Sequence, residues 1–127
     1  MSWQQYVDDS LISTGKVSQA AIFSLDGTEL GTSPSFKVSS TEAKDIIAGF
    51  DNNKVLYDSG VFVAGNKYYV LRINDSLITG REPTGSGVCI AKTNQVILIG
   101  VYKKGMEGGQ CTNTIETLGE FLSGMKY

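Results

Sequence analysis

The sequence contains no histidine, which excludes the side chain most often used for general acid–base catalysis and for metal binding. Serine and cysteine nucleophiles that depend on a neighbouring imidazole are excluded for the same reason. The only two cysteines, Cys89 and Cys111, do not have the CxxC spacing of a zinc site. We therefore expect two reduced thiols, no metal or other cofactor, and a protein that is not an enzyme.

Features of several other protein classes are also missing. The 11 basic and 13 acidic side chains give a net charge of −2, which argues against a nucleic-acid-binding protein. No apolar run approaches the roughly 20 residues of a membrane span, and the first residues lack the basic and apolar regions of a signal peptide. The glycine-rich stretches 85–87 and 105–109 lack the spacing of nucleotide-binding loops. These absences favour a cytoplasmic protein, with a monomer as the expected oligomeric state.

The 127 residues, of which 41% are hydrophobic and 19% charged, suffice for one globular domain over residues 1–127. Fifteen glycines and two prolines indicate short elements joined by tight turns. Three segments are predicted to be helical: Ser2–Thr14, Ser39–Phe50 and Ile115–Met125. Ser2 and Gln5 fit a capping box for the first helix, and Thr112 is the expected N-cap of the last. Gly15 and Gly49 are predicted to end the first and second helices.

Apolar segments between turn signals predict six strands. They are Gln19–Leu25, Val61–Ala64, Lys67–Ile73, Leu77–Thr79, Val88–Ala91 and Val96–Val101. The first and last of these are apolar without alternation, so we expect both to be covered on two faces. Short turns require neighbouring strands to run antiparallel. The sequence thus predicts an α+β fold: a central antiparallel β-sheet with the N- and C-terminal helices packed on one face and a shorter internal helix on the other.

Aromatic side chains gather at the two ends of the chain. Trp3 and Tyr6 lie in the first helix, Phe121 lies in the last, and Tyr127 is the final residue. If the terminal helices pack antiparallel as neighbours, these four rings come together. Exposed rings with N–H and O–H donors would suit a polyproline II segment, whose prolines stack on them while its carbonyls accept hydrogen bonds. The other interpretation is core packing, which is more frequent for aromatic side chains on amphipathic helices.

Residues 59–106 are basic although the chain as a whole is not. This stretch has six basic and two acidic side chains, whereas residues 1–58 have four basic and eight acidic ones. A basic sheet face would attract an acidic partner, and that attraction would weaken with salt. Solvated strand edges and turns explain the same composition, because lysine discourages edge pairing. Lys67 and Arg72 are an odd number of residues apart, so they share a face only if Lys67 reaches round the start of its strand or a bulge intervenes.

Several blocks of the sequence resemble the profilin family, and together they extend over the whole chain. The most specific is the N-terminal block Met1–Asp8, followed by Leu11 and Thr14-Gly15. The other matching positions are Gln19–Ile22, Asp26-Gly27, Phe36, Val38, Ala64–Tyr68, Leu71-Arg72, Ile78, Gly80-Arg81 and Leu118–Leu122. The matches within strands are less specific than the N-terminal block.

This resemblance implies a small protein of the cytoplasm and cytoskeleton that binds monomeric actin (G-actin), promotes its nucleotide exchange and delivers it to filament barbed ends. It also implies binding of proline-rich segments of formin-type proteins and of phosphoinositides, without enzymatic activity. The polyproline site that it implies consists of Trp3, Tyr6, Phe121 and Tyr127. The actin-binding residues that it implies are Tyr57, Lys67, Arg72, Arg81, Gly85, Gly87, Lys92, Glu107, Gly109, Thr112 and Asn113.

Three positions depart from the family's pattern. Leu30 stands where many members have tryptophan, which removes a stacking wall and an N–H donor, so we expect weaker or altered polyproline binding. Ser76 stands where many have arginine, and Thr79 lies near a position that is often tyrosine. Both differences are expected to weaken phosphoinositide and actin contacts. The alternative function is a small-ligand or signalling module with a similar sheet-and-helix layout.

Overall fold

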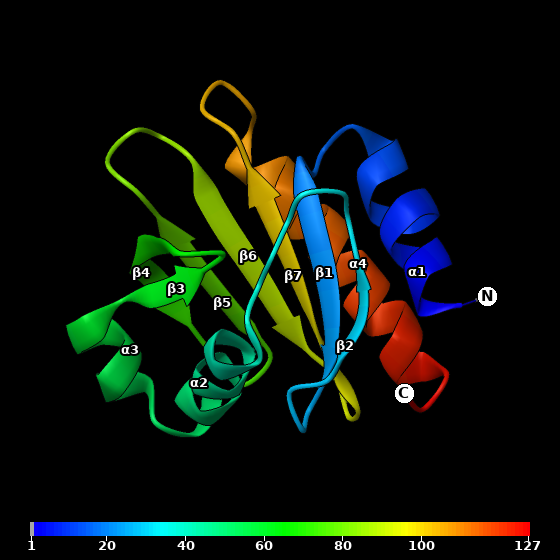
Figure 1. Cartoon of the computed structure of the whole chain (residues 1–127), viewed down its shortest axis with the longest axis horizontal. Coiled ribbons are helices and arrows are strands. Elements are labelled where there is room, and N and C mark those ends of the chain that lie inside the picture. The colour runs from blue at the N-terminus through cyan, green and yellow to red at the C-terminus, as the bar shows by residue number, and fades with distance from the viewer. Residues whose placement is uncertain (1) are drawn as a thin grey trace.

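The computed structural model describes residues 2–127, and its centre is an antiparallel sheet with helices on both faces (Figure 1). The sheet has seven strands in the order β2-β1-β7-β6-β5-β4-β3. The strands are β1 (Gln19–Ser24), β2 (Glu29–Thr32), β3 (Val61–Val63), β4 (Asn66–Ile73), β5 (Leu77–Arg81), β6 (Gly87–Lys92) and β7 (Val96–Tyr102). Every neighbouring pair is antiparallel, as the short turns predict.

The chain begins with a helical segment in three parts: α1 (Trp3–Gln5), the π-helical η1 (Tyr6–Leu11) and the 3-10 turn η2 (Ile12–Thr14). The predicted capping box is confirmed, because the Gln5 N–H donates to Ser2 Oγ at 3.1 Å and the Ser2 N–H donates to Gln5 Oε1 at 2.8 Å. Gly15 ends the segment with a φ of 74°, as predicted. The other helices are α2 (Ser40–Asp51), α3 (Asn53–Ser59) and α4 (Gly108–Gly124). No helix within residues 2–127 is long and apolar enough to cross a bilayer.

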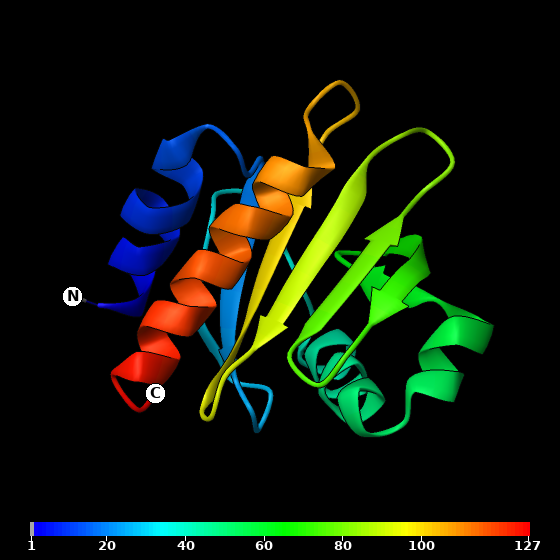
Figure 2. The same ribbon diagram turned by 180° about the vertical axis from the view of Figure 1, so that it is seen from behind.

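The helices form two layers around the sheet. α1 and α4 cover one face, and α2 and α3 cover the other (Figures 1 and 2). The core on the α2 side includes Ile46 and Ile99, and the core on the α4 side includes Leu98 and Ile115. All seven residues of β7 are buried, which confirms the expectation of a strand covered on both faces. The predicted α+β arrangement, with the terminal helices on one face, is therefore confirmed.

The last helix begins earlier than the sequence predicts. α4 starts at Gly108 with Glu107 as its N-cap, so the expectation that Thr112 caps this helix is wrong. The cause is tertiary packing: a Cβ on Gly108 would approach the Tyr102 ring to 2.8 Å, and Cys111 is fully buried. Contact with the sheet therefore stabilises a glycine-rich first turn that has a low helix propensity of its own.

The sequence does not predict β2 or α3, which are both short and lie at the margins of the fold. β2 has four residues, and its register against β1 shifts between Ile22 and Phe23. α3 has seven residues, of which only Leu56 is buried. The expectation that Gly49 ends the second helix is wrong, since α2 continues past it. Gly49 is needed inside the helix, because a Cβ there would lie 2.3 Å from the Leu56 side chain.

The Asp26-Gly27 turn joins β1 to β2 in an antiparallel hairpin, a connection for which this dipeptide is well suited. The Asp26 carboxylate accepts hydrogen bonds from the Ser24 hydroxyl and, at 3.0 Å, from the Thr28 N–H. These hydrogen bonds, that of Ser24 first, lower the pKa of Asp26 from 3.8 to about 2. The carboxylate therefore stays ionised, and holds the turn, down to a pH near that value.

Glu42 joins the N-terminus of α2 to the turn between β3 and β4. Its Oε1 accepts hydrogen bonds from the N–H of Ser39 at 2.9 Å and of Ala64 at 3.0 Å, and its Oε2 accepts from the N–H of Gly65 at 2.9 Å. Ala64 and Gly65 both have positive φ, 52° and 82°. A single carboxylate thus satisfies three backbone donors and fixes an unfavourable turn conformation.

We predict that Glu42→Ala lowers the free energy of unfolding by about 1–3 kcal/mol, because three backbone N–H groups lose their acceptor. The matched control is Asp45→Ala on the same helix, whose exposed carboxylate accepts no hydrogen bond within residues 2–127. That change should stay within about 0.5 kcal/mol. Denaturant titration of both variants measures the difference, and equal losses would contradict the role given to Glu42.

Candidate functional site

The two ends of the chain meet (Figures 1 and 2), and the rings of Trp3, Tyr6 and Tyr127 lie together there. With Phe121, which lies near the end of α4, they make up what we call the terminal aromatic cluster. The Trp3 ring centroid lies 5.8 Å from that of Tyr6 and 5.6 Å from that of Tyr127, the latter edge-on. Tyr127 is held in place because the Gln95 N–H donates to its carbonyl at 3.1 Å, and its own N–H donates to the Leu122 carbonyl at 2.9 Å.

The four rings differ in exposure. Phe121 is 54% exposed, Tyr127 is 38% exposed and Trp3 is half-buried, whereas Tyr6 is only 7% exposed. Docking on exposed rings therefore does not describe Tyr6, which packs into the core between the terminal helices and the sheet. The cluster presents a partly open aromatic surface with Tyr6 beneath it, so the docking and core interpretations each describe part of it.

The start of α1 is fixed directly on β2, the strand that carries Leu30. The Gln4 side chain donates to the Thr32 carbonyl at 2.8 Å and accepts from the Thr32 N–H at 3.1 Å. A Cβ on Gly31 would lie 3.1–3.2 Å from the backbone of Trp3 and Gln4. Leu30 is half-buried and packs against the same core as Trp3. It therefore lies beside the aromatic cluster but offers neither a flat ring nor a donor.

A second surface lies at the opposite end of α4. This cationic depression has a volume of about 620 Å³, and its lining includes Arg72, Arg81, Tyr102, Gly109, Thr112 and Asn113. It exists because α4 packs on β6 and β7 and leaves the outer strands β4 and β5 uncovered (Figure 2). Burial is the main cause that raises the pKa of Tyr102, so this residue remains a neutral phenol in the wall.

A β-bulge in β4 places the basic side chains on one face. Tyr69 pairs with Arg81 and Arg72 pairs with Thr79, so the register shifts between Val70 and Arg72. Of the two explanations for the odd spacing of Lys67 and Arg72, the bulge is the one observed. Lys67 lies on the same face, with its Nζ 5.0 Å from the centroid of the Tyr69 ring.

In the described part of the chain the two arginines of the depression make no ion pair, although the carboxylate of Glu116 also contributes to its lining. Within residues 2–127 the only ion pair joins Lys54 to Asp58 on α3, so Arg72 and Arg81 make none. Both arginines are exposed, and beside them Tyr69 is 56% exposed and Leu71 is 60% exposed. Unpaired guanidinium groups beside exposed apolar side chains are typical of a protein-binding surface.

The structure brings most of the predicted actin-binding residues to this region. Arg72, Arg81, Gly109, Thr112 and Asn113 line the depression. Two more adjoin it: Gly87 against the Tyr102 ring, and Glu107 as N-cap of α4. Lys67 lies on the same face of β4, and Gly85 lies in the turn between β5 and β6. Two lie elsewhere, namely Tyr57 on α3 and Lys92 in a smaller hollow with Ser76 and Glu120.

Sequence reasoning missed the apolar part of this surface. Tyr69 and Leu71 are exposed beside the depression, and Tyr102 and Met106 contribute to its wall. The odd spacing of Lys67 and Arg72 was the available signal, because a bulge between them was one of its two explanations.

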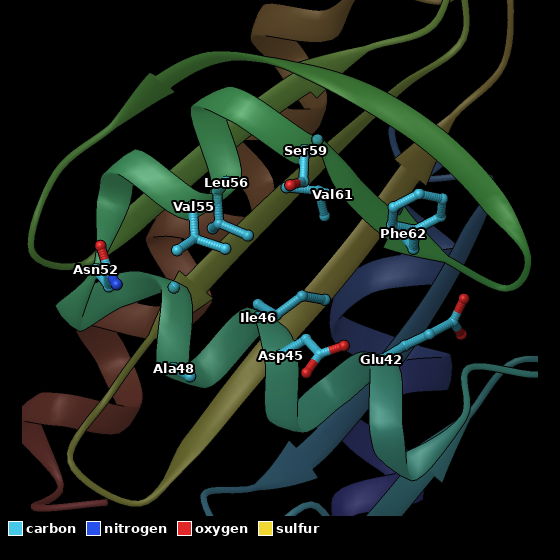
Figure 3. A pocket seen from close by; sticks show the side chains of 12 residues that line it. Glu42, Asp45, Ile46, Ala48, Asn52, Val55, Leu56, Ser59, Val61 and Phe62 are labelled. Atoms are coloured by element: carbon cyan, nitrogen blue, oxygen red, sulfur yellow. The ribbon is translucent and has the colours of Figure 1, made fainter.

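A third hollow, of about 350 Å³, lies on the opposite face between α2, α3 and β3 (Figure 3). Ile46 of α2 faces Val55 and Leu56 of α3 across it, and Asp45 lies at its rim. A small-ligand function would need a hollow of this kind. None of the predicted site residues lines it, and no group of three metal-ligating side chains occurs within residues 2–127.

Comparison with known proteins decides the family. The sequence model of profilin matches residues 1–127. The chain belongs to the profilin family. Profilin-1A of Acanthamoeba castellanii is 39% identical over 127 residues, covering 100% of both chains. The solved structure of Acanthamoeba castellanii profilin II has a TM-score of 0.96 at 36% identity, over 99% of this chain and 100% of that one.

A more distant structure shares the fold. Mouse profilin IIa, solved in complex with a double repeat from the FH1 domain of mDia1, has a TM-score of 0.82 at 18% identity, over 98% of this chain and 99% of that one. The resemblance recognised from the sequence is thus confirmed. Profilins are non-enzymatic actin-binding proteins, in agreement with the expectation that the chain is not an enzyme.

We predict that Tyr127→Ala exposes Trp3, because the edge-on ring contact is lost. The change should cost about 0.5–1.5 kcal/mol of stability, shift the Trp3 emission to longer wavelength and increase its quenching by acrylamide. Trp3 is the only tryptophan, so the signal is unambiguous. Phe121→Ala is the matched control, since it removes an exposed ring on the same surface that is not stacked on Trp3. An unchanged Tyr127→Ala spectrum would contradict the packing described.

Proposed function

We propose that the chain binds monomeric actin through the cationic depression and proline-rich segments through the terminal aromatic cluster. The observation that carries this proposal is the pair of unpaired guanidinium groups, Arg72 and Arg81, beside exposed apolar side chains in a member of the profilin family. Binding of both partners would regulate the nucleotide exchange and polymerisation of actin in the cytoplasm and cytoskeleton.

The depression supplies the groups that an acidic partner surface needs. Arg72 and Arg81 can each form two parallel hydrogen bonds to a carboxylate, and Leu71 and Tyr69 supply apolar area next to them. If the complex favours an open form of actin, nucleotide release accelerates by a shift of population toward that form. The effect is limited by the difference in affinity between the two forms.

The aromatic cluster supplies what a proline-rich chain needs. Phe121 and Tyr127 present flat rings, and Trp3 adds an indole N–H donor for the carbonyls of a polyproline II segment. The mouse relative solved with an FH1 repeat supports a proline-rich partner of the formin type. Because the two surfaces lie at opposite ends of α4, both partners fit at once, and the tether raises the local concentration of actin.

Phosphoinositides at a membrane surface are the third proposed ligand. Their phosphates would use the same guanidinium groups as actin, so the two ligands should compete. Ser76 replaces a frequent arginine of the family, and this removes one phosphate contact. We therefore expect lipid binding to be weaker than in family members that have this arginine.

The test of the two-surface proposal is Arg72→Glu. We expect actin binding to weaken about tenfold or more, because a guanidinium that faces carboxylates becomes a carboxylate. Polyproline binding, followed by Trp3 fluorescence, should not change. The matched control Lys37→Glu reverses a charge between Phe36 and Val38, on the α2 side of the molecule, and should keep both affinities. Loss of actin and polyproline binding together would contradict separate surfaces.

A gain-of-function variant tests the aromatic cluster. Leu30→Trp should tighten polyproline binding by roughly tenfold, because it restores a stacking ring and an N–H donor beside Trp3. Leu30→Phe restores the ring but not the N–H donor. We therefore expect a smaller gain in polyproline affinity, which measures how much of the gain of Leu30→Trp comes from stacking. Fluorescence or calorimetric titration with a proline oligomer gives both affinities. No gain from either folded variant would contradict the position assigned to the ligand.

A further inference from the structure

The fold brings together the only two cysteines of the chain, which are 22 positions apart in the sequence. Cys89 lies on β6, and Cys111 lies in the first turns of α4, which packs against that strand. Both are free thiols, and both are buried, at 1% and 0% exposure. Cys89 also lies against the cationic depression, where Thr112 and Gly109 form part of the wall.

A glycine explains how the helix comes so close to the strand at this point. Gly100 of β7 is the pairing partner of Cys89, and a Cβ on it would lie 2.7 Å from Ile115 of α4. Cys111 precedes Ile115 by one helical turn, so it lies on the same buried face. Because Gly100 has no side chain, α4 packs close to the sheet, and this brings Cys111 close to Cys89.

The Cys89 thiol contacts the first turns of α4, directly beside the position of Cys111. The neighbouring Cys111 thiol is the main cause that lowers the pKa of Cys89, while burial opposes the change. The same contact raises the pKa of Cys111. On its other side, the Cys89 Sγ lies 2.9 Å from Thr112 Oγ1. Cys89 lines the depression and Cys111 does not, so Cys89 is the thiol that an oxidant entering there meets first.

We propose that Cys89 and Cys111 form a reversible intramolecular disulfide that weakens binding at the cationic depression. The regulatory part of this inference rests on the proposed actin-binding function. A disulfide bond is about 2.05 Å long, so the two sulfurs must move closer than any hydrogen-bonded pair. That movement separates Cys89 from the Thr112 hydroxyl and shifts the first turns of α4, which carry Gly109, Thr112 and Asn113.

A peroxide is the proposed oxidant, and it enters from the depression. The Cys89 thiolate attacks one peroxide oxygen, the O–O bond breaks, and hydroxide leaves as water with the thiol's proton. The sulfur of Cys111 then attacks the resulting sulfenic acid, the S–O bond breaks, and a second water forms with the Cys111 proton. Two thiols and one hydrogen peroxide thus give one disulfide and two waters, and a dithiol reductant restores the thiols.

The experiment uses the full chain and hydrogen peroxide, followed by dithiothreitol. After oxidation, a thiol reagent added under denaturing conditions should find no free thiol, and the intact mass should fall by two hydrogen atoms on a monomeric chain. Actin affinity should weaken by roughly fivefold or more, a coupling of ordinary size, and recover after reduction. The Trp3 response to a proline oligomer should remain, because the aromatic cluster lies at the far end of α4.

Cys111→Ser and Cys89→Ser are the matched variants. The actin affinities of both variants should not change after treatment with peroxide. If a variant fails to fold, the actin affinity of the wild type after oxidation is compared with its affinity after re-reduction. Thiols that stay free, or a disulfide between two chains, would overturn the site. An intramolecular disulfide without any change in actin affinity would overturn the regulation. The thiol count tests the disulfide without actin. Reduced protein that does not bind actin would contradict the proposed function alone, so the two failures can be told apart.

Discussion

The close packing of α4 against the sheet is the constraint on which the rest of the structure depends. Gly100 and Gly108 permit it, because a side chain on either would collide with Ile115 or with the Tyr102 ring. Held at this depth on β6 and β7, the helix leaves β4 and β5 uncovered and so creates the cationic depression. Its other end meets α1 and brings the rings of the terminal aromatic cluster together. One helix–sheet contact thus positions both surfaces.

The sequence predicts the elements whose signals are local. The capping box at Ser2 and the left-handed Gly15 mark helix ends, and unbroken apolarity identifies the strands covered on both faces. It does not predict the first two turns of α4, because Gly108 and Gly109 disfavour a helix until the sheet is present. The sequence does not predict β2 or α3 for a related reason, because each has too few buried residues to show a periodicity.

For the two candidate surfaces, too, the sequence predicts the residue types but not the features that depend on tertiary packing. Residue types and the family resemblance identify the arginines and the rings, but the exposure of each ring depends on packing that no local pattern encodes. Tyr6 and Phe121 are both aromatic residues on helices, yet one is buried beneath the other rings and one is open. Only the pairing of Arg72 with Thr79 reveals that a bulge aligns Arg72 with Lys67. The apolar half of the depression follows from that bulge.

The length of α4 has a consequence for any partner that reaches from one surface to the other. Seventeen helical residues separate the depression from the aromatic cluster by roughly 25 Å. An extended polyproline II chain advances 3.1 Å per residue, so about eight residues are needed to bridge that distance. The length of α4 therefore sets the minimum spacer length of a ligand that contacts both surfaces. A ligand docked on the aromatic cluster with a shorter extended spacer cannot reach the cationic depression, whereas one with a longer spacer can.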